Sequence, residues 1–254
     1  MMLWLLSAVT SAWHPIDPQN ALVVDTSKGR AVVALDPRLA PKAVARVKQL
    51  ARMHVYDGLL MWRVVDSPGF NFIQTGDPRN HDGDRSALPD LRAEFSAKIP
   101  ASQIRFVRSG SEAEGFLGVL PVGASSTTGT PVTWGAYCDG VMGMGRERDV
   151  DTANAEIFFM RGTTRYFDHD YTVVGRIIAG LEVMRAVAVG VPPKHPDRLL
   201  HVRVLADLPA GQRPDFEALD VHSPQFDDLV AQARKLHGAD FSVCDLSVPI
   251  RRTP

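Results

Sequence analysis

The pattern of apolar and polar positions predicts a chain made mainly of short β-strands. Residues 21–36 hold two apolar, β-rich runs separated by the turn Ser27-Lys28-Gly29, which predicts a hairpin. Residues 41–58 repeat apolar side chains at helical spacing, with Pro41 suited to the first turn and Gly58 suited to the stop. The chain is therefore expected to open with a strand hairpin followed by one helix.

Further apolar runs predict more strands and a second helix at 181–189. By contrast, residues 79–139 are rich in turn-forming side chains and are expected to be mostly surface loop. Many short strands with only two helices favour a β-barrel or sandwich over a parallel α/β sheet. The remaining predicted strands are 59–65, 70–74, 104–107, 115–120, 140–144, 157–160, 172–178 and 199–205.

The C-terminal residues 209–254 are expected to be an extension to a main domain at 20–208, because the composition changes after Pro209. Within the extension, Ser223 is a good helix N-cap and Gly238 a good stop. The residues between them place four apolar side chains on one face, so this helix is expected to pack on the main domain. The four are Phe226, Leu229, Val230 and Ala233.

The N-terminal residues 1–12 are apolar, too short to span a bilayer but long enough for the core of a secretory signal. Thr10 and Ala12 provide a small-x-small cleavage pattern. We therefore expect a signal peptide at 1–12 and a periplasmic or secreted protein. Because the segment contains no Lys or Arg, a misplaced start or an apolar N-terminal arm in a cytoplasmic protein is the alternative.

Charge and composition exclude several classes of partner. The 254 residues include 28 basic and 29 acidic side chains that are interspersed, with a formal net charge of -1. No basic field for nucleic acid can be assembled from them. The histidines lack the spacing of metal ligands, so no metal is expected. No later stretch approaches the length of a transmembrane helix, so no membrane span is expected in the mature chain.

The two cysteines, Cys138 and Cys244, are too few for a disulfide-built scaffold. In an oxidising compartment they can form one bridge that ties the extension to the main domain across a long loop. Two buried thiols are the alternative.

The predicted strand 59–65 carries an arginine among apolar neighbours. Because side chains alternate along a strand, Arg63 shares a face with Met61 and Val65. An isolated arginine in a strand is most often a rim residue that extends its charge to water. The surrounding sequence changes that interpretation.

Four motifs in register resemble the cyclophilin family of peptidyl-prolyl cis/trans isomerases. YDGLLMWRVV at 56–65, followed by FNFIQTGDP at 70–78, is similar to the signature in which a strand bears the catalytic arginine and the next ends in Gln-x-Gly-Asp-Pro. Residues 140–160 resemble the Gly-x-x-x-Met and Asn-Ser-Gln-Phe-Phe segments, and 167–184 resemble the Leu-Asp-Gly, Val-Phe-Gly and Gly-Met-x-Val blocks. The resemblance covers residues 22–205.

This resemblance implies a mainly β fold: a closed eight-stranded antiparallel barrel capped by two helices, with proline bound on its outer face. It implies proline-containing polypeptides as substrates, assistance to protein folding and no cofactor. Arg63 is the implied catalytic donor. The implied substrate-binding residues are Phe70 or Phe72, Gln74, Met144, Glu156, Phe158, Phe167 and Tyr171.

The sequence also departs from the family pattern around the site. Glu156 replaces the usual Gln, Tyr166 and Tyr171 replace Trp and His, and Gly145-Arg146 replaces Ala-Asn. An ionised Glu156 near a guanidinium can either orient Arg63 or compete with substrate. We therefore expect reduced but measurable isomerase activity. The alternative is a catalytically weak or inactive proline-peptide binding module or chaperone.

Overall fold

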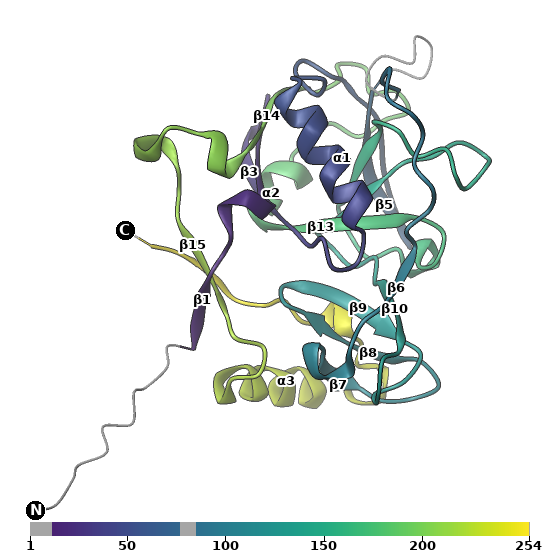
Figure 1. Cartoon of the computed structure of the whole chain (residues 1–254), viewed down its shortest axis with the longest axis vertical. Helices are drawn as coiled ribbons and strands as arrows, with labels where there is room; N and C mark the ends of the chain where they lie inside the picture. Colours follow the sequence, from purple (N-terminus) through teal and green to yellow (C-terminus); the bar gives the residue numbers. More distant parts are fainter. Residues whose placement is uncertain (1–11, 77–84, 254) are drawn as a thin grey trace, which may run out of the picture.

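The computed structural model describes residues 12–76 and 85–253 (Figure 1). Residues 1–11 of the expected signal peptide lie outside this range, as do Asp77 and Pro78 of the Gln-x-Gly-Asp-Pro motif. The described chain forms antiparallel sheets of eight, five and three strands. In Figure 1 the eight-stranded sheet occupies the upper part of the molecule and the five-stranded sheet the lower part.

The eight-stranded sheet contains the hairpin expected at 21–36, with Ser27 and Lys28 between its two paired strands. Strands expected near 70–74, 140–144, 157–160, 172–178 and 199–205 are also present. In spatial order the sheet consists of β14 (Leu199–Val204), β2 (Ala21–Thr26), β3 (Gly29–Leu35), β13 (Thr172–Ala179), β11 (Val141–Met144), β12 (Ile157–Met160), β5 (Phe70–Thr75) and β4 (Met61–Ser67).

The closed barrel expected for this sheet is not confirmed. The sheet curls into a half-barrel, and in the described part of the chain its end strands β14 and β4 share no ladder. They approach at the isolated bridge between Leu60 and Arg198. Beyond that bridge, a register shift between Met61 and Arg63 marks a bulge in β4. The outer edge of β4 then pairs with Gly190, at Val64, and not with β14.

The two helices of the main domain are shorter than their patterns suggest. Helix α1 (Pro41–Arg52) buries its apolar face against β14 and β13, but His54 adopts a left-handed φ of 61° and ends the helical path before Gly58. Helix α2 (Leu181–Arg185) stops well before 189, since the chain then turns to pair Gly190 with Val64. Capping of a barrel by these helices is not confirmed.

Residues 79–139 were expected to be mostly surface loop, and this expectation is wrong for much of the segment. It holds a five-stranded sheet, here called the insertion sheet, and the predicted strand 115–120 is in fact two strands joined at Gly118 (φ 59°). Every residue of β8 and β9 is buried. In spatial order the strands are β6 (Ser96–Lys98), β10 (Val132–Gly135), β9 (Leu120–Ala124), β8 (Ala113–Leu117) and β7 (Arg105–Arg108).

The tail, residues 209–253, covers the insertion sheet. Helix α3 (Pro224–His237) is the helix expected there: the Ser223 hydroxyl accepts the Phe226 N–H at 3.3 Å, and the helix ends at Gly238. Phe226 packs edge-on against Phe116 of β8, with ring centroids 5.4 Å apart. The tail also supplies β15 (Phe216–Leu219) and β16 (Ile250–Arg252), which form a three-stranded sheet with β1 (Trp13–Pro15).

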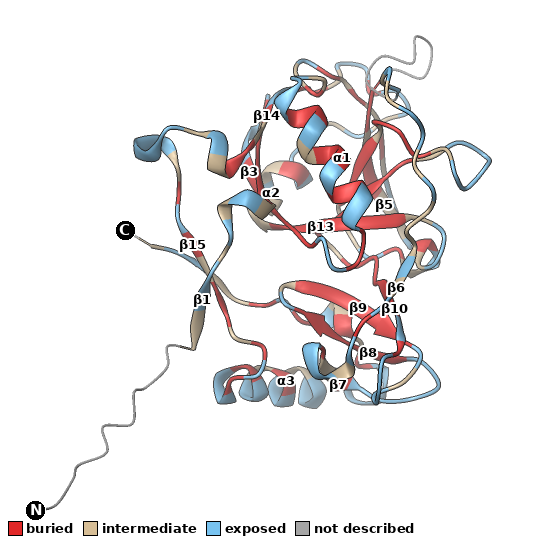
Figure 2. Ribbon diagram, in the orientation of Figure 1, coloured by how far each residue is buried: buried red, intermediate tan, exposed pale blue. Residues whose placement is uncertain are grey.

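Two large hydrophobic cores result, together with a small cluster around Ala21, Val23 and Leu205; the buried residues are red in Figure 2. The first lies between α1 and the inner face of the eight-stranded sheet and includes Met61 and Phe159. The second joins the other face of that sheet to the insertion sheet and α3, and includes Phe116 and Phe158. Short 3₁₀ helices connect the elements: η1 (Pro18–Asn20), η2 (Ala101–Gln103), η3 (Arg165–Phe167), η4 (Leu205–Asp207), η5 (Ala210–Gln212), η6 (Gly238–Asp240) and η7 (Val243–Asp245).

None of the described helices is long and apolar enough to cross a membrane.

Candidate active site

A pocket of about 220 Å³ opens where strands β4, β5 and β12 lie side by side. Eight of the nine candidate residues line it, together with two that were not candidates, Arg146 and Tyr166. Met144 does not line it: its side chain is 1 % exposed and belongs to the first core. The eight are Arg63, Phe70, Phe72, Gln74, Glu156, Phe158, Phe167 and Tyr171.

Arg63 is held at the pocket by its neighbours on β5. It pairs with Gln74 across the β4–β5 ladder, and its Nη1 donates a hydrogen bond to Gln74 Oε1 at 3.2 Å. Its guanidinium carbon lies 5.0 Å from the centroid of the Phe72 ring, a cation–π contact. The side chain is half-buried, so the guanidinium faces the pocket from a fixed position.

Gln74 connects Arg63 to Glu156. The Gln74 Nε2 donates to Glu156 Oε2 at 2.8 Å, while its Oε1 accepts from Arg63. Gly145 makes room for the carboxylate, since a Cβ at this position would lie 1.6 Å from Glu156 Oε1. Two departures from the family pattern therefore depend on each other: the observed conformation of Glu156 requires a glycine at position 145.

Aromatic rings form the apolar side of the pocket. Both Phe70 and Phe72 line it, with centroids 4.9 Å apart, so the choice between them is resolved in favour of both. Phe167 contacts Phe72 at 5.8 Å and Phe158 at 5.8 Å. Phe72, Phe158 and Phe167 are buried, so the pocket floor continues into the second core. Such a surface suits a compact apolar ring.

Tyrosines and an arginine surround the mouth of the pocket. Tyr166 is 65 % exposed and stacks on Phe70 at 5.7 Å, and Arg146 lies over the Tyr171 ring at 4.9 Å. The sequence marks Tyr166 and Arg146 as departures from the family pattern, and that difference was the available signal for a role at the site.

Tyr137 does not line the pocket but supports two residues that do, and the sequence did not predict this role. Its ring stacks on Phe158 at 5.7 Å and meets Phe167 edge-on at 5.6 Å, behind the surface that substrate would touch. Burial raises the pKa of its hydroxyl well above the ordinary value. Its backbone N–H donates to the Asp168 carboxylate at 2.8 Å. Burial also raises the pKa of Asp168, and Arg165 only partly offsets this effect.

The described residues contain no group of His, Cys, Asp and Glu side chains arranged to hold a metal ion. The pocket combines two guanidinium groups, Arg63 beside Phe72 and Arg146 at the mouth, with an amide–carboxylate pair and an aromatic surface. This set can bind an apolar ring and direct a cationic donor at an adjacent polar atom.

Comparison with known proteins agrees with this geometry. The family model for cyclophilin type peptidyl-prolyl cis-trans isomerase/CLD matches residues 21–204. A probable peptidyl-prolyl cis-trans isomerase of Brucella suis biovar 1 is 29% identical over 207 residues, covering 75% of this chain and 85% of the relative. The corresponding Brucella abortus protein (strain 2308) is 28% identical over the same length.

Solved structures extend the similarity beyond the family model. A cyclophilin from Hirschia baltica is 27% identical, with a TM-score of 0.84, covering 94% of this chain and 93% of that one. A cyclophilin-type isomerase of Cryptosporidium parvum, crystallised in the presence of the dipeptide Ala-Pro, shares the fold at 15% identity and a TM-score of 0.50, covering 72% of this chain. The chain belongs to the family of cyclophilin-type peptidyl-prolyl cis-trans isomerases.

Proposed function

We propose that this chain isomerises X-Pro bonds in polypeptides, with Arg63 as the catalytic residue. The observation that carries the proposal is the position of Arg63, whose guanidinium is held by Gln74 beside the Phe72 ring at the edge of an aromatic pocket. A proline ring fits the aromatic surface, and its ring nitrogen, which is the nitrogen of the X-Pro amide, then faces the guanidinium.

The rate enhancement follows from the electronic structure of the peptide bond. Rotation about X-Pro meets a barrier of about 20 kcal/mol because the nitrogen lone pair is delocalised into the carbonyl. Twisting the bond localises that pair on nitrogen, where Arg63 can donate a hydrogen bond to it. This contact exists only in the twisted state, so it lowers the barrier without stabilising either planar form.

Glu156 acts in this proposal as an orienting group. By accepting from the Gln74 NH₂, it leaves Oε1 of Gln74 as the acceptor that faces Arg63. The guanidinium keeps its remaining N–H groups for the substrate. The replacement of Gln by Glu at this position thus supports retention of turnover rather than its loss.

The test is Arg63→Ala in a proline-peptide isomerisation assay, with Arg30→Ala as the matched control. Arg30 lies on β3 of the same sheet and pairs with Asp25 at 2.6 Å, away from the pocket. Losing one preorganised donor is expected to lower kcat/KM by about 10²- to 10³-fold. Equal rates for Arg63→Ala and wild type would remove Arg63 from the mechanism.

The second candidate function is a proline-peptide binding module without turnover. It is favoured by Arg146, which covers Tyr171 at the pocket mouth and holds it there through a hydrogen bond from Nε to the Asp170 carbonyl at 3.2 Å. Titration with a proline peptide beside the turnover assay distinguishes the two. Saturable binding with no rate enhancement would establish the binding module.

We further propose that the clients are unfolded polypeptides in an oxidising compartment, the periplasm or the exterior of the cell. The Cys138–Cys244 disulfide supports this location, because such bonds persist where thiols are not kept reduced.

A further inference from the structure

Phe167, which lines the pocket, and Tyr137, which packs behind it, lie on segments outside the eight-stranded sheet. Tyr137 follows β10 of the insertion sheet, and Phe167 ends the 3₁₀ helix η3. Their rings pack against each other and against Phe158, which lies on β12. The width of the pocket therefore depends on what holds these two segments to the sheet.

The two segments are joined to each other by two hydrogen bonds, and a third within the η3 segment orients the Asp168 carboxylate. The Tyr137 N–H donates to Asp168 Oδ1 at 2.8 Å, and the Thr164 N–H donates to the Tyr137 carbonyl at 2.8 Å. Arg165 Nε donates to the second oxygen of Asp168 at 2.7 Å. Movement of either ring is thus coupled to the other through the backbone.

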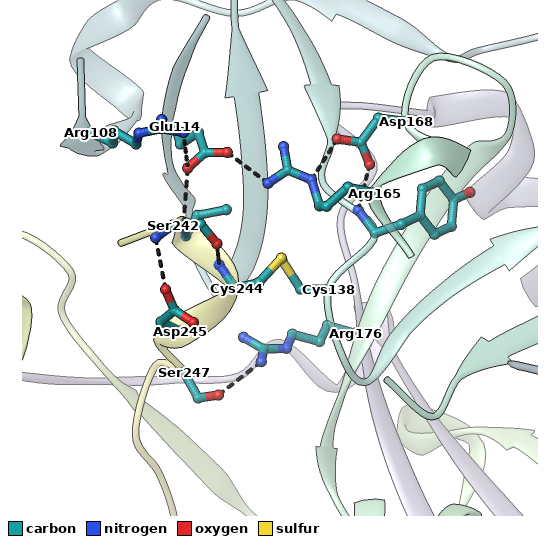
Figure 3. The surroundings of a disulfide bond; sticks show 12 residues. Arg108, Glu114, Cys138, Arg165, Asp168, Arg176, Ser242, Cys244, Asp245 and Ser247 are labelled. Carbon is teal, nitrogen blue, oxygen red and sulfur yellow. Dashed lines mark hydrogen bonds and ion pairs between the residues drawn. A yellow bond between two sulfur atoms is a disulfide. The ribbon is translucent and has the colours of Figure 1, made fainter. Parts of the chain in front are cut away.

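The tail is bonded to both segments (Figure 3). Arg165 Nη1 donates to Glu114 Oε1 at 2.6 Å, and the other oxygen of Glu114 accepts the Val243 N–H of the tail at 3.1 Å. The next tail residue, Cys244, forms a disulfide with Cys138, which directly follows Tyr137. The tail is thus connected by a covalent bond to Cys138, the neighbour of Tyr137, and to η3 through Glu114; these two connections are here called the circuit.

Burial makes this circuit sensitive to the loss of any member. The Glu114 side chain is 7% exposed and its carboxylate also faces Arg108 at 3.6 Å. Removing one partner from a buried ion pair leaves the other charge desolvated and uncompensated. Because Arg165 lies in η3, loss of its Glu114 partner would disturb the element that carries Phe167.

We propose that the tail is a positioning element of the proline pocket, acting through Cys244 of the tail, Glu114 of β8 and Arg165 of η3 as positioning residues. They hold Tyr137 and Phe167 in place, so breaking either connection loosens the aromatic wall and weakens substrate binding, while Arg63 on β4 keeps its chemistry. The inference rests on the proposed function, since it concerns the same pocket.

The first test compares the oxidised protein with the protein reduced by dithiothreitol. Reduction converts the disulfide to two thiols, and dithiothreitol supplies the two electrons and becomes a cyclic disulfide. We expect KM for a proline peptide to rise by about five- to tenfold while kcat changes less than about twofold. Cys244→Ser should reproduce the reduced protein and be insensitive to dithiothreitol. Unchanged KM after thiol titration has verified reduction would overturn the proposal.

The second test compares Glu114→Gln with two control substitutions in the tail. Glu217→Gln weakens an exposed pair with Arg251 in the tail, and Val230→Ala loosens the packing of α3 without touching the circuit. Glu114→Gln should raise KM and the dissociation constant of the peptide, and each control should raise them much less. If Val230→Ala raises KM as much at a temperature where all variants are folded, the effect is general destabilisation and the proposal fails.

Failure of the proposed function gives a different result. If wild type binds a proline peptide but lacks turnover, the proposed catalysis fails, and the dissociation constants of the oxidised, reduced and Glu114→Gln proteins still decide the positioning role. If wild type neither binds nor turns over, both proposals fail together.

Discussion

The two hydrophobic cores of this molecule serve the pocket in different ways. The first core, between α1 and the eight-stranded sheet, packs beneath β4 and β5 and so fixes the backbone that carries Arg63 and Gln74. The second core contains Phe72, Phe158 and Tyr137 and continues through the insertion sheet to α3. The comparison indicates that the cationic donor and the aromatic wall depend on separate packing units, which meet at one pocket.

The largest effects on stability are expected from removing one large buried side chain from each core in turn. Phe159 belongs to the first core and Phe116 to the second, and both side chains are fully buried. Replacing either by Ala is expected to lower the free energy of unfolding by about 3–5 kcal/mol, because a cavity is left behind. Chemical denaturation monitored by circular dichroism measures this.

The same pair of variants separates the roles of the two cores. Phe116→Ala should also raise KM for a proline peptide, whereas Phe159→Ala should leave KM near the wild-type value in the folded protein. Equal KM effects would show that the cores act on the pocket as one unit. Two unfolding transitions in wild type would show instead that the cores are not cooperative.

A smaller effect is expected from Gly145→Ala, which alters the carboxylate that orients Gln74 and Arg63. In Gly145→Ala the new Cβ would overlap the Glu156 carboxylate, so that side chain must leave Gln74. Arg63 then loses its oriented acceptor, and kcat/KM should fall by about tenfold with little change in stability. Glu156→Ala in the same background removes the overlap, so the two substitutions should not be additive. Additive losses would contradict the dependence of one residue on the other.

The smallest expected effect is on the pH dependence of stability. It concerns Asp57, which is hydrogen-bonded to β14 of the eight-stranded sheet. Burial by itself would raise the pKa of Asp57, but hydrogen bonds from Arg203 and from the Val202 N–H outweigh it and hold that pKa well below its ordinary value. The unfolded chain therefore binds the proton more readily, so Asp57 stabilises the fold above about pH 4 and this contribution is lost as the pH falls further.

In Asp57→Asn the free energy of unfolding should therefore fall less between about pH 4 and pH 2 than in wild type. At neutral pH the two proteins should differ by at most about 1 kcal/mol, because the pair is partly exposed. Thermal unfolding measured across this range is the check. A parallel pH dependence in wild type and variant would remove Asp57 from the acid response.

Sequence reasoning was most successful where contacts are local. The hairpin of β2 and β3, the apolar face of α1 and the Ser223-capped helix α3 are all determined by residues close in the chain, and each is confirmed. The motifs placed eight candidate residues in one pocket, because β4, β5 and β12 bring fixed motif positions together. Met144 lies outside the pocket because its side chain packs in the first core.

The sequence predictions were wrong where residues are buried by segments that lie far away in the chain. The strands β8 and β9 are too short and too close to turn residues to be separated by pattern, and their partners α3 and η7 lie far along the chain. The disulfide shows the scale, since its cysteines are 106 residues apart. Tyr137 was missed for the same reason: neither its stacking on Phe158 nor its bond to Asp168 leaves a periodic signal.

By itself, the sequence determined the family, the strands that carry Arg63 and Gln74, and the chemistry expected of an arginine beside aromatic rings, because motif spacing and strand alternation are local properties. Only the tertiary structure decided that Gln74 connects Arg63 to Glu156, that the sheet is a half-barrel, and that the tail is bonded to the aromatic wall. Those features depend on distances between segments that are remote in the chain, which no local pattern of side chains specifies.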